Sequence, residues 1–300
     1  MSNLPGRIAT FTLAAREPET NTWAILTASN YLAVGALVPW IDCKAGLVVS
    51  QSFANPDAAG AALEAMRQGQ TSTQALDVFL SGDPIASKRQ VALMDLTGEA
   101  TIFNGPECTN EVESIQGNDF LVLGNMLKAG TCEQVAETYS ASRRAGYEIG
   151  DAMLKAMIAG QQAGGDKRGK LAAALLIKRP NAGYLGSSDT LVDLRVDAHP
   201  RPLLQLRDLY SLFKLYNPQQ FDLHMVALDD LESHQLQLLF AILGQLNKHQ
   251  IALDINDTAT IKNILADHNL SSNFDPDNQR VSQILLSEGH ALMRLLTSPL

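Results

Sequence analysis

The chain has 300 residues, of which 46% are hydrophobic and 18% are charged, and its formal net charge is −9. This length can bury at least one sizeable core, and two domains are the expected division. The negative charge, without a basic stripe interleaved with aromatic residues, argues against nucleic acid as a partner. No apolar run reaches the roughly 20 residues that span a bilayer, so we expect no membrane contact.

Two further features of composition bear on location and on cofactors. Met1–Arg7 lack the charged start and apolar stretch of a signal peptide, which favours a cytoplasmic protein. Cys43, Cys108 and Cys132 are too few and too widely spaced for a disulfide framework or a metal site, and we expect free thiols. For Cys43 and Cys108 we expect buried structural thiols rather than nucleophiles. The six histidines have no zinc-binding spacing. We therefore expect neither a metal nor a cofactor.

The first half of the chain predicts strands, then a helix pair, then strands. Two strands, 8–16 and 23–29, form a hairpin, a buried connection covers 32–39, and a third strand covers 46–53. Asn55 caps a helix that runs to Gln68, and a capping box at Thr71 opens another that runs to Leu80. Three strands follow at 90–96, 99–103 and 119–123.

The second half repeats this order. A capping box at Thr131 predicts a helix to about Arg143, and a second helix covers about 148–162. The uniformly apolar run 171–178 predicts a strand buried on both faces, with 190–196 as its partner. From Pro202 onward the spacing of leucines is helical.

This order of elements predicts an α+β protein. Antiparallel sheets with helices gathered in pairs indicate a four-layer α/β/β/α sandwich over residues 1–200, followed by a helical domain over 201–300. Exposed sheet edges and an apolar stripe in the second domain need covering, so we expect a homodimer. The stripe consists of Leu236, Leu239, Phe240, Leu243 and Leu246.

The distribution of histidine limits the chemistry of the first domain. All six histidines come after residue 198. Histidine is the commonest general base near neutral pH, so a catalytic first domain needs another base. A free α-amino group on a Thr, Ser or Cys that opens the first strand is one solution. A domain without catalytic activity explains the absence equally well.

Five segments of the first domain carry a resemblance to a known family. They are Ala28–Trp40, Ser50–Pro56, Gly124–Leu127, Ala163–Gly169 and Asp193–Asp197. In this order they resemble domain-of-unknown-function family 1028, a branch of the N-terminal-nucleophile (Ntn) hydrolase superfamily, over roughly residues 8–200. The resemblance implies the sandwich fold but no established substrate. Residues from about 210 to 295 resemble a peptidoglycan-binding extension that some members carry.

The resemblance also implies a site, with Thr10 in the place of the nucleophile that opens the first strand. Its freed amine would deprotonate the hydroxyl for attack on a small amide. Asp166 would orient the amine. Backbone N–H groups at Ser52–Asn55 or at Gly124–Asn125 would hold the oxyanion. Lys167 or Arg168 would neutralise an anionic substrate. We thus expect Thr10, Asp166 and Asn125 to be catalytic, and the substrate-binding residues to be Ser29, Asn30, Ser52, Asn55, Gly124, Lys167 and Arg168.

A second hypothesis is a catalytically inactive binding or scaffold protein with the same fold. Nine residues precede Thr10 and would have to be removed. Members of the family often carry Arg or His where Asn30 stands, Gln where Leu123 stands, and polar residues where Leu171 and Ala172 stand. Each difference removes a polar group. Gly164-Gly165-Asp166 is equally consistent with a plain turn, and Asp193, Arg195 and Asp197 with a solvated face of an edge strand.

Overall fold

The computed structural model describes residues 10–108, 111–221, 223–247, 250–251 and 253–297. Within them the protein is mixed α+β, with three sheets and eight α-helices, which confirms the predicted class in its coarse form. The chain divides into two compact units, Met1–Leu206 and Arg207–Leu300. None of the described helices combines the length and the apolar character that crossing a bilayer requires.

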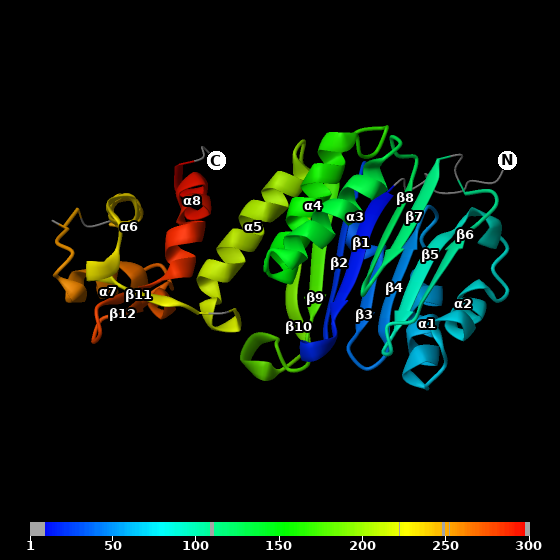
Figure 1. The fold of residues 1–300 in the computed structure, drawn as a ribbon, viewed down its shortest axis with the longest axis horizontal. Coiled ribbons are helices and arrows are strands. Elements are labelled where there is room, and N and C mark those ends of the chain that lie inside the picture. The colour runs from blue at the N-terminus through cyan, green and yellow to red at the C-terminus, as the bar shows by residue number, and fades with distance from the viewer. Residues whose placement is uncertain (1–9, 109–110, 222, 248–249, 252, 298–300) are drawn as a thin grey trace. The chain divides into compact units, whose positions relative to one another are not determined.

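The first unit contains two antiparallel sheets (Figure 1). The larger has the order β10-β9-β2-β1-β8-β7, and the smaller has the order β3-β4-β5-β6. Their strands are β1 (Thr10–Glu17), β2 (Thr22–Ser29), β3 (Pro39–Asp42), β4 (Gly46–Gln51), β5 (Gln90–Asp95), β6 (Ala100–Asn104), β7 (Val112–Gly117), β8 (Phe120–Asn125), β9 (Ala172–Lys178) and β10 (Thr190–Val196).

Two helix pairs accompany these sheets, and most of the predicted helix starts are confirmed. The helices are α1 (Pro56–Arg67), α2 (Ser72–Leu80), α3 (Thr131–Arg144) and α4 (Ile149–Ala163). Asn55 caps α1 by accepting a hydrogen bond from the Ala58 N–H, and Thr71 forms the predicted capping box of α2. The capping box predicted at Thr131 is wrong. Gly130 is the N-cap of α3, because its positive φ of 80° already turns the chain into the helix.

Each helix pair packs on one sheet, and the sheets pack on each other. Helices α1 and α2 lie on the four-stranded sheet, and α3 and α4 lie on the six-stranded sheet (Figure 1). The inner face of each sheet contributes alternating apolar side chains to one core, for example Ala14 and Ile25 from one sheet and Val49 and Met94 from the other. Toward the end where β1 begins, buried polar side chains, Thr12, Gln51 and Gln90, replace the apolar ones between the sheets.

The sequence missed two strands of this unit. β3 lies at the end of the stretch expected to be a buried connection, and its four residues are too short for an alternating pattern. β7 has half-buried residues on both faces, so the contrast between polar and apolar positions is weak. The predicted pairs 8–16 with 23–29 and 90–96 with 99–103 are confirmed as antiparallel neighbours. The strands predicted at 171–178 and 190–196 are partners, as expected, and this pair is also antiparallel. Ile8 and Ala9, included in the first predicted strand, lie outside the described residues.

The second unit is not purely helical, which corrects the prediction for 201–300. Its helices are α6 (Ser233–Leu246), α7 (Thr258–Ala266) and α8 (Gln283–Thr297), and α5 (Pro202–Tyr216) leads into it from the first unit. A sheet of order β11-β13-β12 accompanies them, formed by β11 (Met225–Ala227), β12 (Phe274–Asp275) and β13 (Arg280–Ser282). Strands of two or three residues leave no periodic signal. Leu239, Leu243 and Leu246 of the predicted stripe are buried in the core of this unit.

We predict that Gly160→Ala lowers the free energy of unfolding by about 1–3 kcal/mol. A Cβ atom at Gly160 in α4 would lie 2.3 Å from Cγ2 of Val135 in α3, a short branched side chain that cannot move aside. Gly60→Ala in α1 is the matched control. No atom lies within 4 Å of its added Cβ, so the higher helix propensity of Ala should stabilise by up to about 1 kcal/mol. Urea unfolding of both variants tests this; equal effects would contradict the close approach of α3 and α4.

Candidate functional site

Thr10 lies at the start of β1 and faces the space between the two sheets. Side chains alternate along a strand, so Thr10 shares its face with Thr12 and Ala14. Ala14 belongs to the core between the sheets, and Thr12 bonds across to the opposite sheet. The strand register places Thr10 opposite Ser29 of β2. The side chain of Thr10 is completely buried, with 0% of its surface exposed.

A network of buried polar side chains joins the two sheets at this end. Thr12 of β1 donates its hydroxyl to Oε1 of Gln51 in β4 at 2.7 Å, and Gln51 donates to Oε1 of Gln90 in β5 at 2.7 Å. Asn125, at the end of β8, donates to the same Oε1 atom at 3.0 Å. Gln90 in turn donates to Asn104 at 2.9 Å, and Asn104 is exposed, so the network reaches the surface. Buried polar networks of this kind fix one packing of the elements they connect.

Two polar atoms beside this network lack a partner. Ser52 Oγ and Asn125 Oδ1 are buried and form no hydrogen bond with any described residue. Ser52 also has a φ of 68°, which is unusual for a residue with a side chain. A buried polar group without a partner costs about 1–3 kcal/mol. In native proteins, buried polar atoms of this kind are generally bonded to an ordered water or to a ligand.

The strained corner at Ser52 is held by Arg89. The Arg89 guanidinium donates to the carbonyl oxygens of Phe53 and Ala54, the second at 3.1 Å, and pairs with Asp83 at 2.7 Å. Burial of Asp83 acts to raise its pKa, but the hydrogen bonds from Arg89 and from backbone N–H groups outweigh burial, so the pKa is lowered. Asp83 is therefore ionised near neutral pH, and the pair fixes the chain between β4 and α1.

The loop that follows α4 fastens the other side of the site. The Asp166 carboxylate, almost fully buried, accepts hydrogen bonds from the Asn30 N–H at 3.0 Å and the Arg168 N–H at 2.9 Å, and pairs with the Arg168 guanidinium at 3.0 Å. Lys128 donates its N–H to Gly165 O, and Lys167 donates its N–H to Met126 O. The loop thus ties the end of β2 to the end of β8, and these two strands flank β1.

The predicted site residues gather only in part. Thr10, Ser29, Asn30, Gly124, Asn125, Asp166 and Arg168 lie at one end of the six-stranded sheet. Ser52 ends the strand segment of the opposite sheet, and Asn55 serves as the helix cap described above. The Lys167 ammonium pairs with Glu111 at 2.7 Å, and both side chains are about half exposed, so this lysine points to solvent.

Sequence reasoning missed Gln51 and Gln90 as members of the site. Both continue an inward-facing apolar alternation, Leu47-Val49-Gln51 in β4 and Gln90-Ala92-Met94 in β5. A polar side chain that occupies a core position at the end of a strand is the signal that could have found them.

The two buried cysteines, Cys43 and Cys132, do not offer an alternative nucleophile. Burial raises the pKa of Cys43 to about 11, and nearby Asp189 adds to the effect. Burial also raises the pKa of Cys132 well above its usual range. Both thiols are protonated near neutral pH and serve as core residues, as predicted for Cys43. Cys108 is half-buried, so its predicted burial is wrong. Among the described residues, no cluster of three or more His, Cys, Asp or Glu side chains could hold a metal ion.

Comparison with known proteins identifies the family. Residues 10–206 match the family of unknown function DUF1028. This chain belongs to DUF1028. Protein SPO2555 from Silicibacter pomeroyi, whose crystal structure is assigned to the same family, is 30% identical, with a TM-score of 0.62. That match covers 69% of this chain and 86% of the other chain. Among curated proteins, none matches this chain.

We predict that Gln90→Leu in this DUF1028 chain lowers the free energy of unfolding by about 2–4 kcal/mol. The substitution removes the acceptor of two buried amides, those of Gln51 and Asn125, and leaves both donors unpaired. Gln116→Leu, an exposed position in β7, is the matched control and should change stability by less than about 0.5 kcal/mol. Chemical denaturation measures both, and a Gln90→Leu variant as stable as the control would refute the structural role of the network.

Proposed function

We propose that this DUF1028 chain is an amidohydrolase of the Ntn type, acting on a small amide or other C–N bond. The packing of its two sheets and two helix pairs is then the α/β/β/α sandwich of that superfamily. The observation that carries the proposal is the position of Thr10 in the fold. Thr10 is the first residue of β1 and faces the space between the sheets. It lies beside the polar network, where two buried atoms form no hydrogen bond with any described residue. The family match also begins at Thr10.

The proposed reaction starts once water has hydrolysed the Ala9–Thr10 peptide bond. The freed α-amine of Thr10 takes the proton of its own hydroxyl, and Oγ1 attacks the carbonyl carbon of the substrate. The C–N bond then breaks, and the leaving nitrogen takes the proton from the α-ammonium group. Water, deprotonated by the same amine, hydrolyses the ester, releasing the acid and restoring Thr10. Residues 1–9 lie outside the described residues.

The residues around Thr10 have proposed roles in this reaction that follow from where they lie. The end of β8, at Gly124 and Asn125, pairs next to the start of β1 and supplies donors for the oxyanion. Asn125 Oδ1 and Ser52 Oγ take polar groups of the substrate, because both atoms are buried and unpaired. Asp166, through the Asn30 N–H, holds the end of β2 beside Thr10 and acts as a positioning residue. Ser29, opposite Thr10, lines the substrate position.

A catalytically inactive binding or scaffold protein is the second candidate. Three observations favour it. Thr10 is completely buried, the Asp166 carboxylate is already engaged by Asn30 and Arg168, and Lys167 is turned to Glu111. In this case the unpaired atoms of Ser52 and Asn125 hold a ligand without converting it.

We predict that a chain cleaved from a removable fusion so that it begins at Thr10 hydrolyses simple acyl amides such as p-nitroanilides. Thr10→Ala in the same form should lose roughly a thousandfold or more of that activity while its stability changes by no more than about 1 kcal/mol. Thr10→Ser should retain turnover. The matched control is Thr22→Ala, another buried threonine, at the opposite end of the β1–β2 pair, which should leave turnover unchanged.

Two measurements decide between the candidates. Intact mass of the purified chain should show loss of Met1–Ala9, and a β-lactone probe should leave its acyl group on Thr10, located by peptide mass spectrometry. A full-length mass together with no turnover and no adduct on the cleaved form would reject the hydrolase and leave the binding protein. Turnover that survives Thr10→Ala would remove Thr10 from the mechanism.

Three further expectations remain proposals. A homodimer would cover the edges of the six-stranded sheet, β10 and β7. The other two proposals are a cytoplasmic location and binding of peptidoglycan by the second unit. Light scattering that shows a monomer at micromolar concentration would reject the dimer. Failure of residues 1–300 to sediment with purified peptidoglycan would reject peptidoglycan binding.

A further inference from the structure

A separate cavity lies on the helical side of the six-stranded sheet, within the first unit. It has a volume of about 210 Å³ and is lined by Ile158, Gln161, Gln162, Lys170, Arg201, Pro202, Leu203 and Leu204. Three of these residues lie in the last two turns of α4, and Lys170 lies two residues before β9. Arg201 directly precedes α5, and the remaining three residues form the first turn of that helix. Because α4 packs on the face of the sheet opposite the core between the sheets, this cavity is distinct from the site at Thr10.

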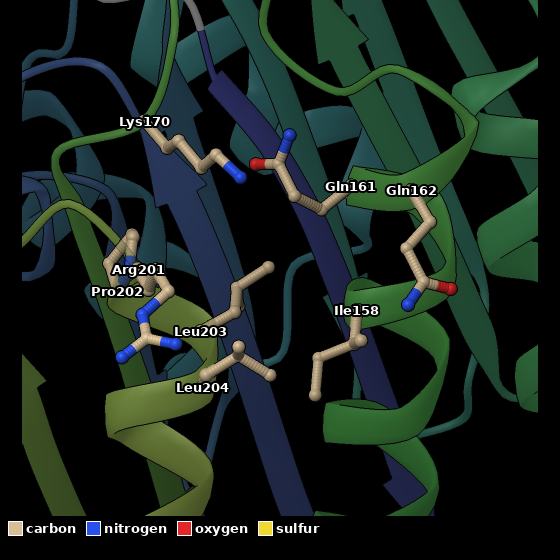
Figure 2. Close-up of a pocket in the computed structure, with 8 residues that line it drawn as sticks. All are labelled: Ile158, Gln161, Gln162, Lys170, Arg201, Pro202, Leu203 and Leu204. Atoms are coloured by element: carbon tan, nitrogen blue, oxygen red, sulfur yellow. The ribbon is translucent and has the colours of Figure 1, made fainter.

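The residues that line the cavity are partly apolar, and all the charged ones are positive. Figure 2 shows Lys170 and Arg201 on one side, Ile158, Gln161 and Gln162 of α4 on the other, and Leu203 and Leu204 between them. The exposed lining is mostly apolar, yet it includes two cations and two amides and no carboxylate. Neither Lys170 nor Arg201 pairs with a carboxylate of any described residue. The lining is thus locally positive, although the chain as a whole has a net charge of −9.

Backbone contacts hold the cationic side of the cavity in place. The His199 N–H donates to Leu171 O at 2.7 Å, which joins the segment before α5 to the segment that carries Lys170. The Arg201 N–H donates to Nδ1 of His199 at 3.0 Å. The two cations are therefore presented by chain segments fixed to each other, and a ligand that bridges them orders only side chains.

We propose that this cavity binds a small amphipathic carboxylate. The carboxylate would lie between Lys170 and Arg201, and a short apolar chain would lie on Ile158, Leu203 and Leu204. A water molecule occupies ~30 Å³ in the liquid, so the cavity has room for roughly seven groups of that size. This is close to the size of a carboxylate with about six carbons in all, such as hexanoate. The amides of Gln161 and Gln162 complete the polar rim. The site is independent of the proposed hydrolysis, since none of its residues takes part in it.

The test is a titration of the full chain, observed by NMR, with hexanoate as the probe and hexanamide as its neutral isostere. Hexanoate should bind at least about tenfold more tightly than hexanamide, and salt should weaken it. Lys170→Gln and Arg201→Gln should each weaken hexanoate by about two- to fivefold, as expected for partly exposed ion pairs. Leu204→Trp, which fills the cavity, should abolish binding.

Arg144→Gln is the matched control, because Arg144 is an exposed arginine at the end of α3, outside the cavity. It should leave hexanoate affinity unchanged, and thermal melts should show that all four variants are folded. Equal binding of hexanoate and hexanamide would overturn the proposal. So would the absence of binding at tens of millimolar hexanoate, or an affinity that neither Lys170→Gln nor Arg201→Gln changes.

Discussion

The need to satisfy buried amides between two sheets is the constraint on which the first unit depends. Apolar contacts have no preferred direction, but hydrogen bonds do. The Gln90 carbonyl oxygen accepts from two amides, and its two N–H groups lie within hydrogen-bond distance of three acceptors. Its partners belong to both sheets. Any shift of one sheet against the other breaks the buried bonds from Gln51 and Asn125 to Gln90 and leaves their donors without a partner. The network therefore sets the register in which the sheets pack.

The same constraint explains why the candidate site lies at this end of the sheets. Two sets of contacts fix the backbone at this polar end. Arg89 binds the corner after β4, and the loop that carries Asp166 binds the ends of β2 and β8. They fix the strained backbone at Ser52 and the end of β8 at Asn125. Ser52 Oγ and Asn125 Oδ1 are buried and form no hydrogen bond within the described part of the chain. Local cost of this kind persists only where the surroundings over-determine it, and it is typical of sites that bind a ligand.

Much of the fold was predictable because its signals are local. The cap at Asn55, the capping box at Thr71 and the apolar run of β9 each specify an element within a few residues. The missed strands β3 and β7 are short or half-buried, and the small sheet of the second unit has strands of two or three residues. At Thr131 two signals competed, and the glycine before it determined the start of α3.

The candidate site was predictable only in part, because its assembly depends on long-range contacts. Thr10 and Asp166 are predictions from the resemblance and from strand order. The Asp166–Asn30 hydrogen bond brings the loop after α4 to β2, the partner strand of β1. The sequence could not show that Lys167 pairs with Glu111, or that Gln51 and Gln90 meet across the sheets.

The most direct test of the account is a high-resolution crystal structure of the chain, examined at Ser52 Oγ and Asn125 Oδ1. We predict an ordered water or a bound ligand within hydrogen-bond distance of each atom, with the side-chain amide of Asn125 still donating to Gln90. A structure in which the Asn125 side chain is turned away from Gln90, and both atoms are paired with protein groups, would contradict it.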